Sequence, residues 1–389
     1  MRLHRFVMTF LLASISCCIS ANEWVQLKGE PFVEYRERLS HFITDRKALV
    51  DANKGAMEVE AVLPYERFPN KSCSGPKIGV LMFHGLSDSP FALRDSAQAL
   101  SDSCFYTRVM ILPGHGTKAE DLINVTRDDW RQAVANATEQ FSQQVDVVYL
   151  AGFSTGGALV TEYAWNNPSV VEGVVLFSPL FKINSSIDWL APLLSPFINW
   201  LDHHESDDYA KYASIPVPAI AEAYKLAKEV RQIVVDTPAK VPVFLALSEE
   251  DATVDSSVTL EVFNASFKGH PYSEMVLYSA IQQAAFDEQV EIINTDLPEQ
   301  RIFGLAHMAV HGAPDNPYYG EQGKYRICSW YLGEESRYQE CREAEHNWFG
   351  ERSDKLSSLS DVAARLSWNP YFDDLMERVS AFVSKTREL

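Results

Sequence analysis

The chain has 389 residues, of which 46% are hydrophobic, and a formal net charge of −19 at pH 7. This length is compatible with one large domain or with two domains, and the hydrophobic content is sufficient for a sizeable core. So acidic a chain is repelled by phosphate backbones and by anionic lipid surfaces, so nucleic acid is not an expected partner.

The first residues have the pattern of a secretory signal peptide. Arg2 and Arg5 are basic, residues 6–19 are apolar, and small residues precede Asn22. The apolar run is shorter than the ~20 residues that a membrane-spanning helix needs. We therefore predict that residues 1–21 are removed, that no stable membrane span remains, and that the protein is exported to the periplasm or secreted. Lipidation at Cys17 is a less favoured alternative, since only the small residue before it fits a lipoprotein cleavage site.

From residue 22 onward, the chain is predicted to form one α/β domain, residues 22–389. Residues 22–55 are expected to form a helical wrap, and the period-two alternation over residues 57–63 predicts an antiparallel first strand. Buried strands are predicted in the segments 78–83, 106–112, 145–154, 170–179, 241–247 and 290–294. Helices are predicted between them, including 91–100 and 121–144. This alternation favours a mainly parallel, doubly wound sheet.

Residues 181–239 interrupt the alternation of strands and helices. The segment 189–201 is dense in Trp, Leu, Phe and Pro, an acidic stretch follows at 203–212, and a helix is predicted at 220–235. Because the whole segment lies between two core strands and contains no predicted strand, we expect a helical cap over the carboxyl ends of the sheet. Its apolar face would line a pocket for an acyl chain or another hydrophobic group. Alternatively, these side chains only seal the cap onto the core.

The sequence Gly-Phe-Ser-Thr-Gly at residues 152–156 follows a buried strand and precedes a helix-forming run. This arrangement fits the Gly-x-Ser-x-Gly nucleophile elbow, a sharp turn in which larger side chains would collide with the neighbouring strand and helix. We predict that Ser154 is a nucleophile at the carboxyl end of the sheet. A serine that only caps the helix is the alternative.

An alcohol is a poor nucleophile at neutral pH, so Ser154 needs an imidazole base, and the imidazole needs a carboxylate to orient it. In folds with this elbow, the acid follows a late strand and the histidine follows the last strand. Asp251 and His307 occupy these positions. They are the predicted catalytic acid and base.

Each of these two residues has neighbours of the same chemical type. Glu250 and Asp255 flank Asp251, and His311 follows His307. We favour Asp251 because it comes just past the predicted strand and precedes a turn. Acidic residues in loops are otherwise usually solvated.

A tetrahedral acyl intermediate carries a negative oxygen, which backbone N–H groups stabilise. One donor comes from the residue after the nucleophile, Thr155, and one from the loop after an earlier strand. Leu86 is the predicted second donor, since it follows His84 and Gly85 at the end of the strand 78–83. We interpret His84 as a packed residue that fixes this loop by hydrogen bonds.

Without the signal peptide, the chain keeps Cys73, Cys104, Cys328 and Cys341. An even number in an exported protein indicates two disulfides. The first two cysteines each precede a predicted strand, and adjacent parallel strands would bring them together at one sheet edge. The last two are close in sequence. We therefore predict the pairs 73 with 104 and 328 with 341.

Taken together, the motifs at 83–86, 112–116 and 152–157, with Asp251 and His307, resemble the α/β-hydrolase superfamily. The resemblance is to its monoglyceride-lipase and carboxylesterase branch, also described as serine-aminopeptidase-like, and it covers residues 56–310. It implies ester hydrolysis through an acyl-enzyme without a cofactor. Two features depart from the family pattern: residues 312–389 form a C-terminal extension, and the usual glycine before the acid is missing around residues 248–250.

The sequence thus predicts a serine hydrolase that cleaves carboxylic esters of small hydrophobic molecules, with no cofactor. No metal is expected, because the histidines are dispersed and no zinc-type spacing occurs. A peptidase that releases N-terminal residues, or a thioesterase, is the nearest alternative, since Glu205, Asp207 and Asp208 could bind a substrate amine. A non-catalytic binding protein is the alternative of another class. The sequence leaves the oligomeric state open.

Overall fold

The computed structural model describes residues 24–70, 72–281, 287–359 and 361–386. The predicted signal peptide and Cys17 lie outside these residues. Within the described ranges, no helix is both long enough and apolar enough to cross a membrane.

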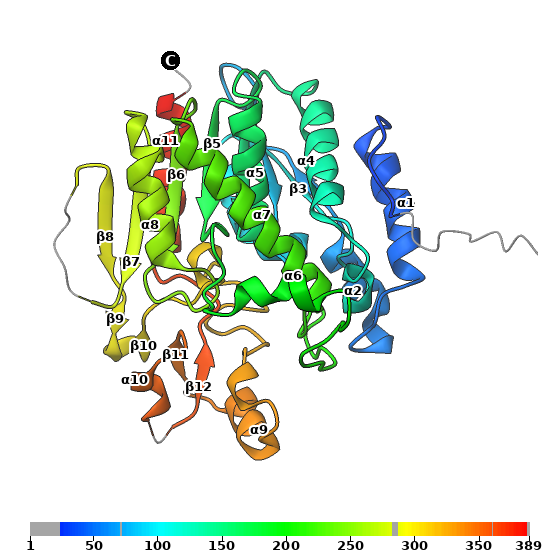
Figure 1. Cartoon of the computed structure of the whole chain (residues 1–389), viewed down its shortest axis with the longest axis vertical. Helices are drawn as coiled ribbons and strands as arrows, with labels where there is room; N and C mark the ends of the chain where they lie inside the picture. Colours follow the sequence, from blue (N-terminus) through cyan, green and yellow to red (C-terminus); the bar gives the residue numbers. More distant parts are fainter. Residues whose placement is uncertain (1–23, 71, 282–286, 360, 387–389) are drawn as a thin grey trace, which may run out of the picture.

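A sheet of eight strands forms the centre of the molecule (Figure 1). Its order is β1-β3-β2-β4-β5-β6-β7-β8, and all neighbouring strands are parallel except β1 and β3. The strands are β1 Tyr65–Arg67, β2 Ile78–Phe83, β3 Tyr106–Met110, β4 Val147–Phe153, β5 Gly173–Phe177, β6 Val243–Ser248, β7 Glu274–Ser279 and β8 Val290–Asn294. The central strands are almost wholly buried, as their continuous apolar runs predict for strands covered on both faces. The predicted mainly parallel, doubly wound sheet is confirmed.

Helices cover both faces of this sheet, and each face has its own hydrophobic core. On one face lie α1 Phe32–Thr44, α4 Arg127–Ser142, α5 Thr155–Asn166, α7 Val217–Asp236 and α8 Ser256–Ala265. On the other face lie α3 Arg94–Asp102 and α11 Phe372–Thr386. The carboxyl ends of the parallel strands therefore stay open between the two helical layers, where the predicted site residues follow β2, β4 and β6.

The strand predicted over residues 57–63 is wrong, because this segment is the helix α2 Gly55–Val62. Val59 and Val62 are buried on one side of α2, and the Glu58 carboxylate accepts hydrogen bonds from the backbone of Val50 and Asp51. A run of seven residues is too short to distinguish the period of two of a strand from the 3.6-residue period of a helix. Residues three apart, such as Val59 and Val62, also lie on one face of a helix. The antiparallel strand is instead β1, which follows α2.

The sequence analysis also misses β7, which lies between β6 and β8 in the sheet. Its apolar core of four residues is too short to be distinguished by periodicity from a buried piece of helix. The strand predicted at 290–294 is confirmed as β8 but is not the last strand. A second sheet follows, with the order β12-β11-β10-β9.

This small sheet connects distant parts of the C-terminal region. Its strands are β9 Asp296–Leu297, β10 Ile302–Phe303, β11 Trp348–Gly350 and β12 Ala363–Arg365. The strands β11 and β12, together with α9 Glu335–Glu343 and α10 Asp354–Ser357, belong to residues 312–371, which we call the insertion segment. Figure 1 shows this segment in orange beyond one end of the large sheet.

The last helix, α11, packs on the large sheet. The rings of Tyr149 and Phe244 contact Phe382, and the Tyr149 hydroxyl donates to the Val383 carbonyl oxygen (3.2 Å). Residues 312–389, predicted as one extension, thus consist of the insertion segment followed by a helix of the main core. The helix α11 begins at Phe372, after β12 at Ala363–Arg365.

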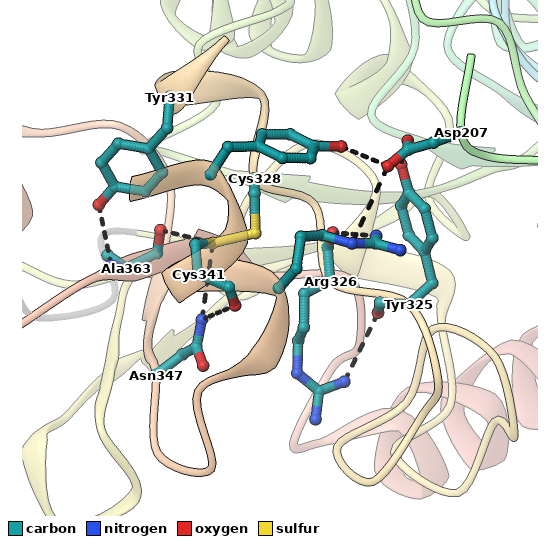
Figure 2. Close-up of a disulfide and its surroundings, with 10 residues drawn as sticks. Asp207, Tyr325, Arg326, Cys328, Tyr331, Cys341, Asn347 and Ala363 are labelled. Atoms are coloured by element: carbon teal, nitrogen blue, oxygen red, sulfur yellow. Dashed lines mark hydrogen bonds and ion pairs between the residues drawn. A yellow bond between two sulfur atoms is a disulfide. The ribbon is translucent and has the colours of Figure 1, made fainter. Parts of the chain in front are cut away.

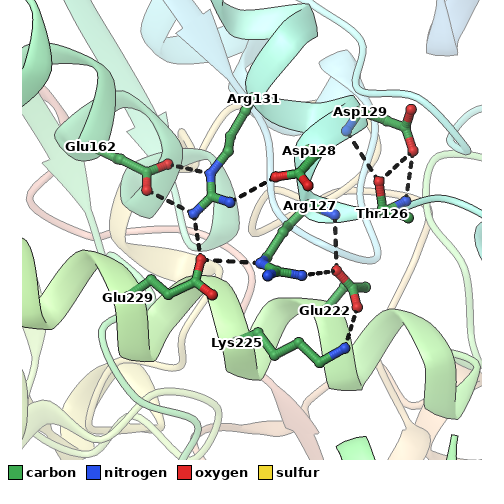
Figure 3. A network of polar contacts seen from close by, with 9 residues as sticks. All are labelled: Thr126, Arg127, Asp128, Asp129, Arg131, Glu162, Glu222, Lys225 and Glu229. Atoms are coloured by element: carbon green, nitrogen blue, oxygen red, sulfur yellow. Dashed lines mark hydrogen bonds and ion pairs between the residues drawn. The ribbon is translucent and has the colours of Figure 1, made fainter.

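The predicted cap segment, residues 181–239, contains two helices, α6 Ala191–Leu194 and α7. Pro216 and Pro218 mark the start of α7, three residues before the predicted start, as proline favours the first turn of a helix. Figure 3 shows a network of charged side chains that ties α7 to the main domain. Arg131 of α4 donates to Glu162 of α5 (2.7 Å) and to Glu229 of α7 (2.6 Å).

Both predicted disulfides are confirmed. Cys73 and Cys104 are bonded just before β2 and β3, at the amino ends of these parallel strands. Cys328 and Cys341 are bonded within the insertion segment. The two bonds therefore lie at opposite ends of the large sheet.

Candidate active site

Ser154 lies at the sharp turn between β4 and α5, with backbone angles of φ 54° and ψ −116°. Few non-glycine residues adopt a positive φ, and such strain persists only where neighbours hold the backbone. Here the Ser154 N–H donates to the Phe177 carbonyl oxygen (3.1 Å), and the Ser154 carbonyl accepts from the Leu180 N–H (2.9 Å). The end of β5 and the loop after it thus hold the backbone on both sides of Ser154.

The glycines around Ser154 are required by close backbone contacts. A Cβ on Gly152 would lie 2.4 Å from the carbonyl carbon of Gly156, and one on Gly156 would lie 2.1 Å from the Phe83 carbonyl oxygen. Real Cβ atoms do not approach backbone this closely. The sharp turn predicted from the Gly-x-Ser-x-Gly pattern is therefore present, and side chains at its two glycines would collide with the neighbouring backbone.

Asp251 and His307 are joined directly, by a distance of 2.6 Å between Asp251 Oδ2 and His307 Nδ1. Asp251 lies in the turn after β6, where its Oδ1 accepts hydrogen bonds from the backbone N–H groups of Thr253 (2.8 Å) and Val254 (2.9 Å). With Nδ1–H donating to the carboxylate, the other ring nitrogen of His307, Nε2, is left as the basic atom.

Burial by itself raises the pKa of Asp251, but the charge and hydrogen bond of His307, with the two backbone N–H groups, hold it below its ordinary value. The Asp251 carboxyl is therefore ionised at neutral pH. It can orient the imidazole and stabilise its protonated form.

Ser154 and His307 line one cavity of about 400 Å³, and the two predicted oxyanion donors, Leu86 and Thr155, line it as well. One wall is apolar and comes from the end of β5 and the cap segment: Leu180, Ile183, Ile215, Ile220 and Ala223. Another wall comes from the insertion segment: Tyr325, Ile327, Cys328, Ser329, Leu332, Tyr338 and Arg365. The cavity is thus enclosed by two segments that lie far apart in the sequence.

The apolar wall differs from the one predicted. The aromatic and leucine side chains of the segment 189–201 do not line this cavity, and Trp189, Leu193, Phe197 and Leu201 are exposed, with Phe197 84% accessible. Smaller aliphatic residues flanking that segment face the cavity instead. The sequence could not separate the two sides because α6 is only one turn long and has no clear periodicity.

The neighbouring acids and histidines have other partners. Asp255 forms an ion pair with Lys182 (2.7 Å) and accepts from the backbone at the start of α8, and Glu250 accepts from the Ala280 N–H (2.7 Å). His311 is buried against Phe153 and Phe177, and burial lowers its pKa to about 3. Asp251 is accordingly the acid that contacts the histidine at the cavity.

His84 is buried and holds the loop after β2, as the sequence analysis interprets it. Its Nε2 accepts from the Leu112 N–H (3.1 Å), and its Nδ1 donates to the Gly85 carbonyl oxygen (2.8 Å). Burial lowers its pKa to about 3, so the ring is neutral. It therefore fixes the backbone beside Leu86.

The acidic stretch of the cap segment contacts tyrosines of the insertion segment. Asp208 is buried and accepts from the hydroxyls of Tyr318 (3.2 Å) and Tyr319 (2.5 Å). Asp207 accepts from Tyr325 (2.5 Å), as Figure 2 shows, and from Tyr338. These carboxylates connect the two walls of the cavity. Sequence reasoning missed this role, because partners more than a hundred residues apart leave no local pattern.

Burial raises the pKa of Asp208 to about 6, although hydrogen bonds from Tyr319 and the Ala210 backbone act in the opposite direction.

Among the residues that the structure describes, no group of three or more His, Cys, Asp or Glu side chains could hold a metal ion.

Comparisons with known proteins agree with this architecture. The sequence model of the family described as "Serine aminopeptidase, S33" matches residues 74–270. A thermostable monoacylglycerol lipase of Bacillus sp. (strain H-257) is 30% identical over 115 residues, which are 30% of this chain and 43% of the lipase. The match thus spans less than half the length of that relative.

Solved structures with a similar arrangement have low sequence identity. One comes from a study of LipS and LipT, two metagenome-derived lipolytic enzymes (20% identity, TM-score 0.49, 63% of this chain and 89% of that chain). Another is the monoacylglycerol lipase of Paleococcus ferrophilus (16% identity, TM-score 0.45, 67% of this chain and 93% of that chain).

Proposed function

Because the chain belongs to the serine aminopeptidase S33 family and has an α/β-hydrolase fold, we propose that it hydrolyses carboxylic esters, with Ser154 as nucleophile. The observation that carries this proposal is the shared cavity of Ser154, in its strained turn, and His307, whose Nδ1 is bonded to Asp251 at 2.6 Å. A serine that only caps a helix would need neither the strain nor a carboxylate-bound histidine beside it.

In the proposed reaction, Ser154 Oγ attacks the acyl carbon while His307 Nε2 takes its proton. The N–H groups of Leu86 and Thr155 stabilise the negative oxygen of the tetrahedral intermediate. His307 then gives the proton to the leaving alkoxide, the C–O bond breaks, and an acyl-enzyme remains. Water, activated by the same imidazole, releases the acid and regenerates Ser154. Asp251 stays ionised throughout and stabilises the imidazolium.

Hydrophobic small-molecule esters are the proposed substrates. The aliphatic wall of the cavity supports this choice, since an acyl chain gains about 0.8 kcal/mol per buried methylene group. The similarity to a monoacylglycerol lipase supports esters of the same general class. The acyl part would lie against Leu180, Ile183 and Ile220.

Hydrolysis of p-nitrophenyl esters of increasing acyl length tests this function. We expect the protein to turn over these esters, and Ser154→Ala and His307→Ala to lower kcat by at least about a thousandfold. Circular dichroism would establish that both variants are folded. Full activity of folded Ser154→Ala would contradict the proposal.

Aminoacyl p-nitroanilides, assayed beside the esters, test the peptidase alternative that the family description keeps open. Of the three acids of this alternative, Asp207 and Asp208 already accept tyrosine hydroxyls, which disfavours them as binders of a substrate amine. Glu205 lines the cavity and stays a candidate for this role. We expect esters to be the faster substrates. Faster cleavage of the anilides would favour a peptidase, and no turnover by a folded protein would favour a binding protein.

Export is part of the proposal. The two disulfides support a final location in an oxidising compartment, where such bonds persist. We expect the mature protein, isolated after expression of the full chain, to begin at Asn22. A mature protein that begins at a lipid-modified Cys17 would contradict the proposed cleavage site.

A further inference from the structure

We propose that Glu351, in the insertion segment, is a positioning residue that holds the acid and the histidine of the active site together. This inference rests on the proposed function. Glu351 Oε2 lies 3.4 Å from the backbone N of His307 and 3.4 Å from the backbone N of Ala252, the residue after Asp251. A single carboxylate oxygen thus accepts from both loops that carry the Asp251–His307 pair.

Arg365 keeps Glu351 in place. Its Nη2 donates to the same Oε2 (2.6 Å), its Nε also reaches that oxygen (3.2 Å), and its Nη2 donates to the Thr253 hydroxyl (2.8 Å). Thr253 in turn donates its N–H to Asp251 Oδ1. Arg365 therefore supports the acid loop directly as well as through Glu351.

The burial of this pair makes its geometry well defined. The Glu351 side chain is 3% exposed and that of Arg365 is 19% exposed. A buried carboxylate is costly without a paired cation, and the bidentate contact with the Arg365 guanidinium holds Glu351 in one orientation. A carboxylate oxygen is also a stronger hydrogen-bond acceptor than the amide oxygen of a glutamine.

The small sheet determines where Glu351 and Arg365 lie. Glu351 directly follows β11, Arg365 ends β12, and Gly350 pairs with Arg365 in the parallel register of these strands. On its other side β11 pairs with β10, where Phe303 lies opposite Gly350 and the chain then runs to His307. The insertion segment and the histidine loop are therefore built on one sheet. This arrangement explains how a segment that follows the histidine in sequence can fix its position.

General-base catalysis requires the imidazole to be held within about 0.5 Å of its productive position. Loss of the Glu351 contacts would free both loops while leaving Ser154 and the aliphatic wall of the cavity unchanged. The expected effect is therefore on kcat and not on KM. If the Glu351–Arg365 pair only attached the insertion segment to the rest of the protein, its loss would lower the free energy of unfolding and leave kcat unchanged.

The test compares Glu351→Ala and Glu351→Gln with wild type on a p-nitrophenyl ester. We expect Glu351→Ala to lower kcat about 10- to 100-fold with KM within about twofold, as for misplacement of a reacting group. Glu351→Gln keeps an acceptor oxygen but loses the ion pair with Arg365, so its kcat should lie between those of Glu351→Ala and wild type. The matched control is Asp361→Asn, which removes the ion pair of Asp361 with Arg301 (2.8 Å) beside the same small sheet. The kcat of this variant should stay at the wild-type value.

If Glu351→Ala does not fold, Glu351→Asp replaces it. Aspartate keeps the charge, but its shorter side chain cannot reach both backbone N–H groups, so we again expect a lower kcat. Wild-type kcat in a folded Ala or Asp variant would overturn the inference. Ser154→Ala, measured in parallel, separates the two failures: if that variant is inactive, the proposed function stands, and if it is fully active, the proposed function itself fails.

Discussion

Ser154 is exposed to the cavity because its neighbours lack side chains. Gly152 and Gly156 allow β4, α5 and the end of β2 to approach one another at backbone distance, and this approach forces the serine into a positive φ. The strain at Ser154 is therefore a property of the packing around it. Its hydrogen bonds to the end of β5 keep it there.

Replacement of Gly156 by alanine should disrupt the elbow. The new Cβ would meet the Phe83 carbonyl oxygen at 2.1 Å, and a backbone atom cannot move aside without shifting β2. We expect a loss of at least about 2 kcal/mol in the free energy of unfolding, with loss of ester hydrolysis. The control is Gly269→Ala, since no heavy atom lies within 4 Å of a Cβ at that position. Equal stability of the two variants would contradict the steric account.

Asp208 should make folding stability depend on pH. Its folded pKa of about 6 lies above the ordinary 3.8, so its contribution to stability is fully present below about pH 4 and is lost as the pH rises through about 6. We expect the unfolding free energy of wild type, relative to Asp208→Asn, to fall by about 2 kcal/mol between pH 4.5 and pH 7.5. Urea unfolding at several pH values measures it. A difference between the two proteins that does not change with pH would rule out this titration.

The helix α7 connects the cavity to the helices α4 and α5. It supplies Ile220 and Ala223 to the cavity, and its other residues Glu222 and Glu229 contact the arginines of α4. Glu162 of the same network lies on α5, the helix that begins directly after Ser154. The network therefore joins the wall of the cavity to this helix (Figure 3).

Replacement of Arg131 by methionine tests this connection. The substitution leaves Glu162, which is 9% exposed, without its bidentate partner. We expect a loss of about 1–3 kcal/mol in the free energy of unfolding. Asp128→Asn is the control, because this carboxylate is 74% exposed and its ion pair with Arg131 should contribute less than about 1 kcal/mol. A larger effect of Asp128→Asn than of Arg131→Met would contradict this account.

The elements that sequence predicted best are those with an unambiguous local pattern. The apolar runs of β2 and β4 and the turn at Ser154 could be recognised without any tertiary information, as could the position of Asp251 after a strand. The helix α2 and the strand β7 could not, because each is too short for its periodicity to be decisive. Glu351 gave no signal at all, since its contacts at Ala252 and His307 lie 99 and 44 residues away.

The cavity lies between the cap segment and the insertion segment, which are far apart in the sequence. The cap segment contributes aliphatic residues and the polar stretch 205–211, and the insertion segment contributes a second wall that includes Cys328. Hydrogen bonds from tyrosines to Asp207 and Asp208 hold these walls together, and Figure 2 shows that Tyr325 and the Cys328–Cys341 disulfide belong to the same part of the insertion segment. The second disulfide, Cys73–Cys104, lies at the far end of the sheet.

The two disulfides should therefore differ in their effects. Removal of Cys328–Cys341 by paired Cys→Ser substitutions should loosen the polar wall, so we expect KM for ester substrates to rise several-fold. Removal of Cys73–Cys104 should lower the free energy of unfolding by about 3 kcal/mol while KM stays unchanged. Steady-state kinetics and urea unfolding of both variants measure this difference. An unchanged KM in the first variant would show that the insertion segment does not shape the binding site.

Labelling with a fluorophosphonate tests whether Ser154 is an activated nucleophile. We expect one phosphonyl group per folded chain, located by peptide mapping on Ser154, with slower labelling of His307→Ala and none after the protein is unfolded. A folded wild-type protein that is not labelled, or one labelled at another serine, would contradict the account.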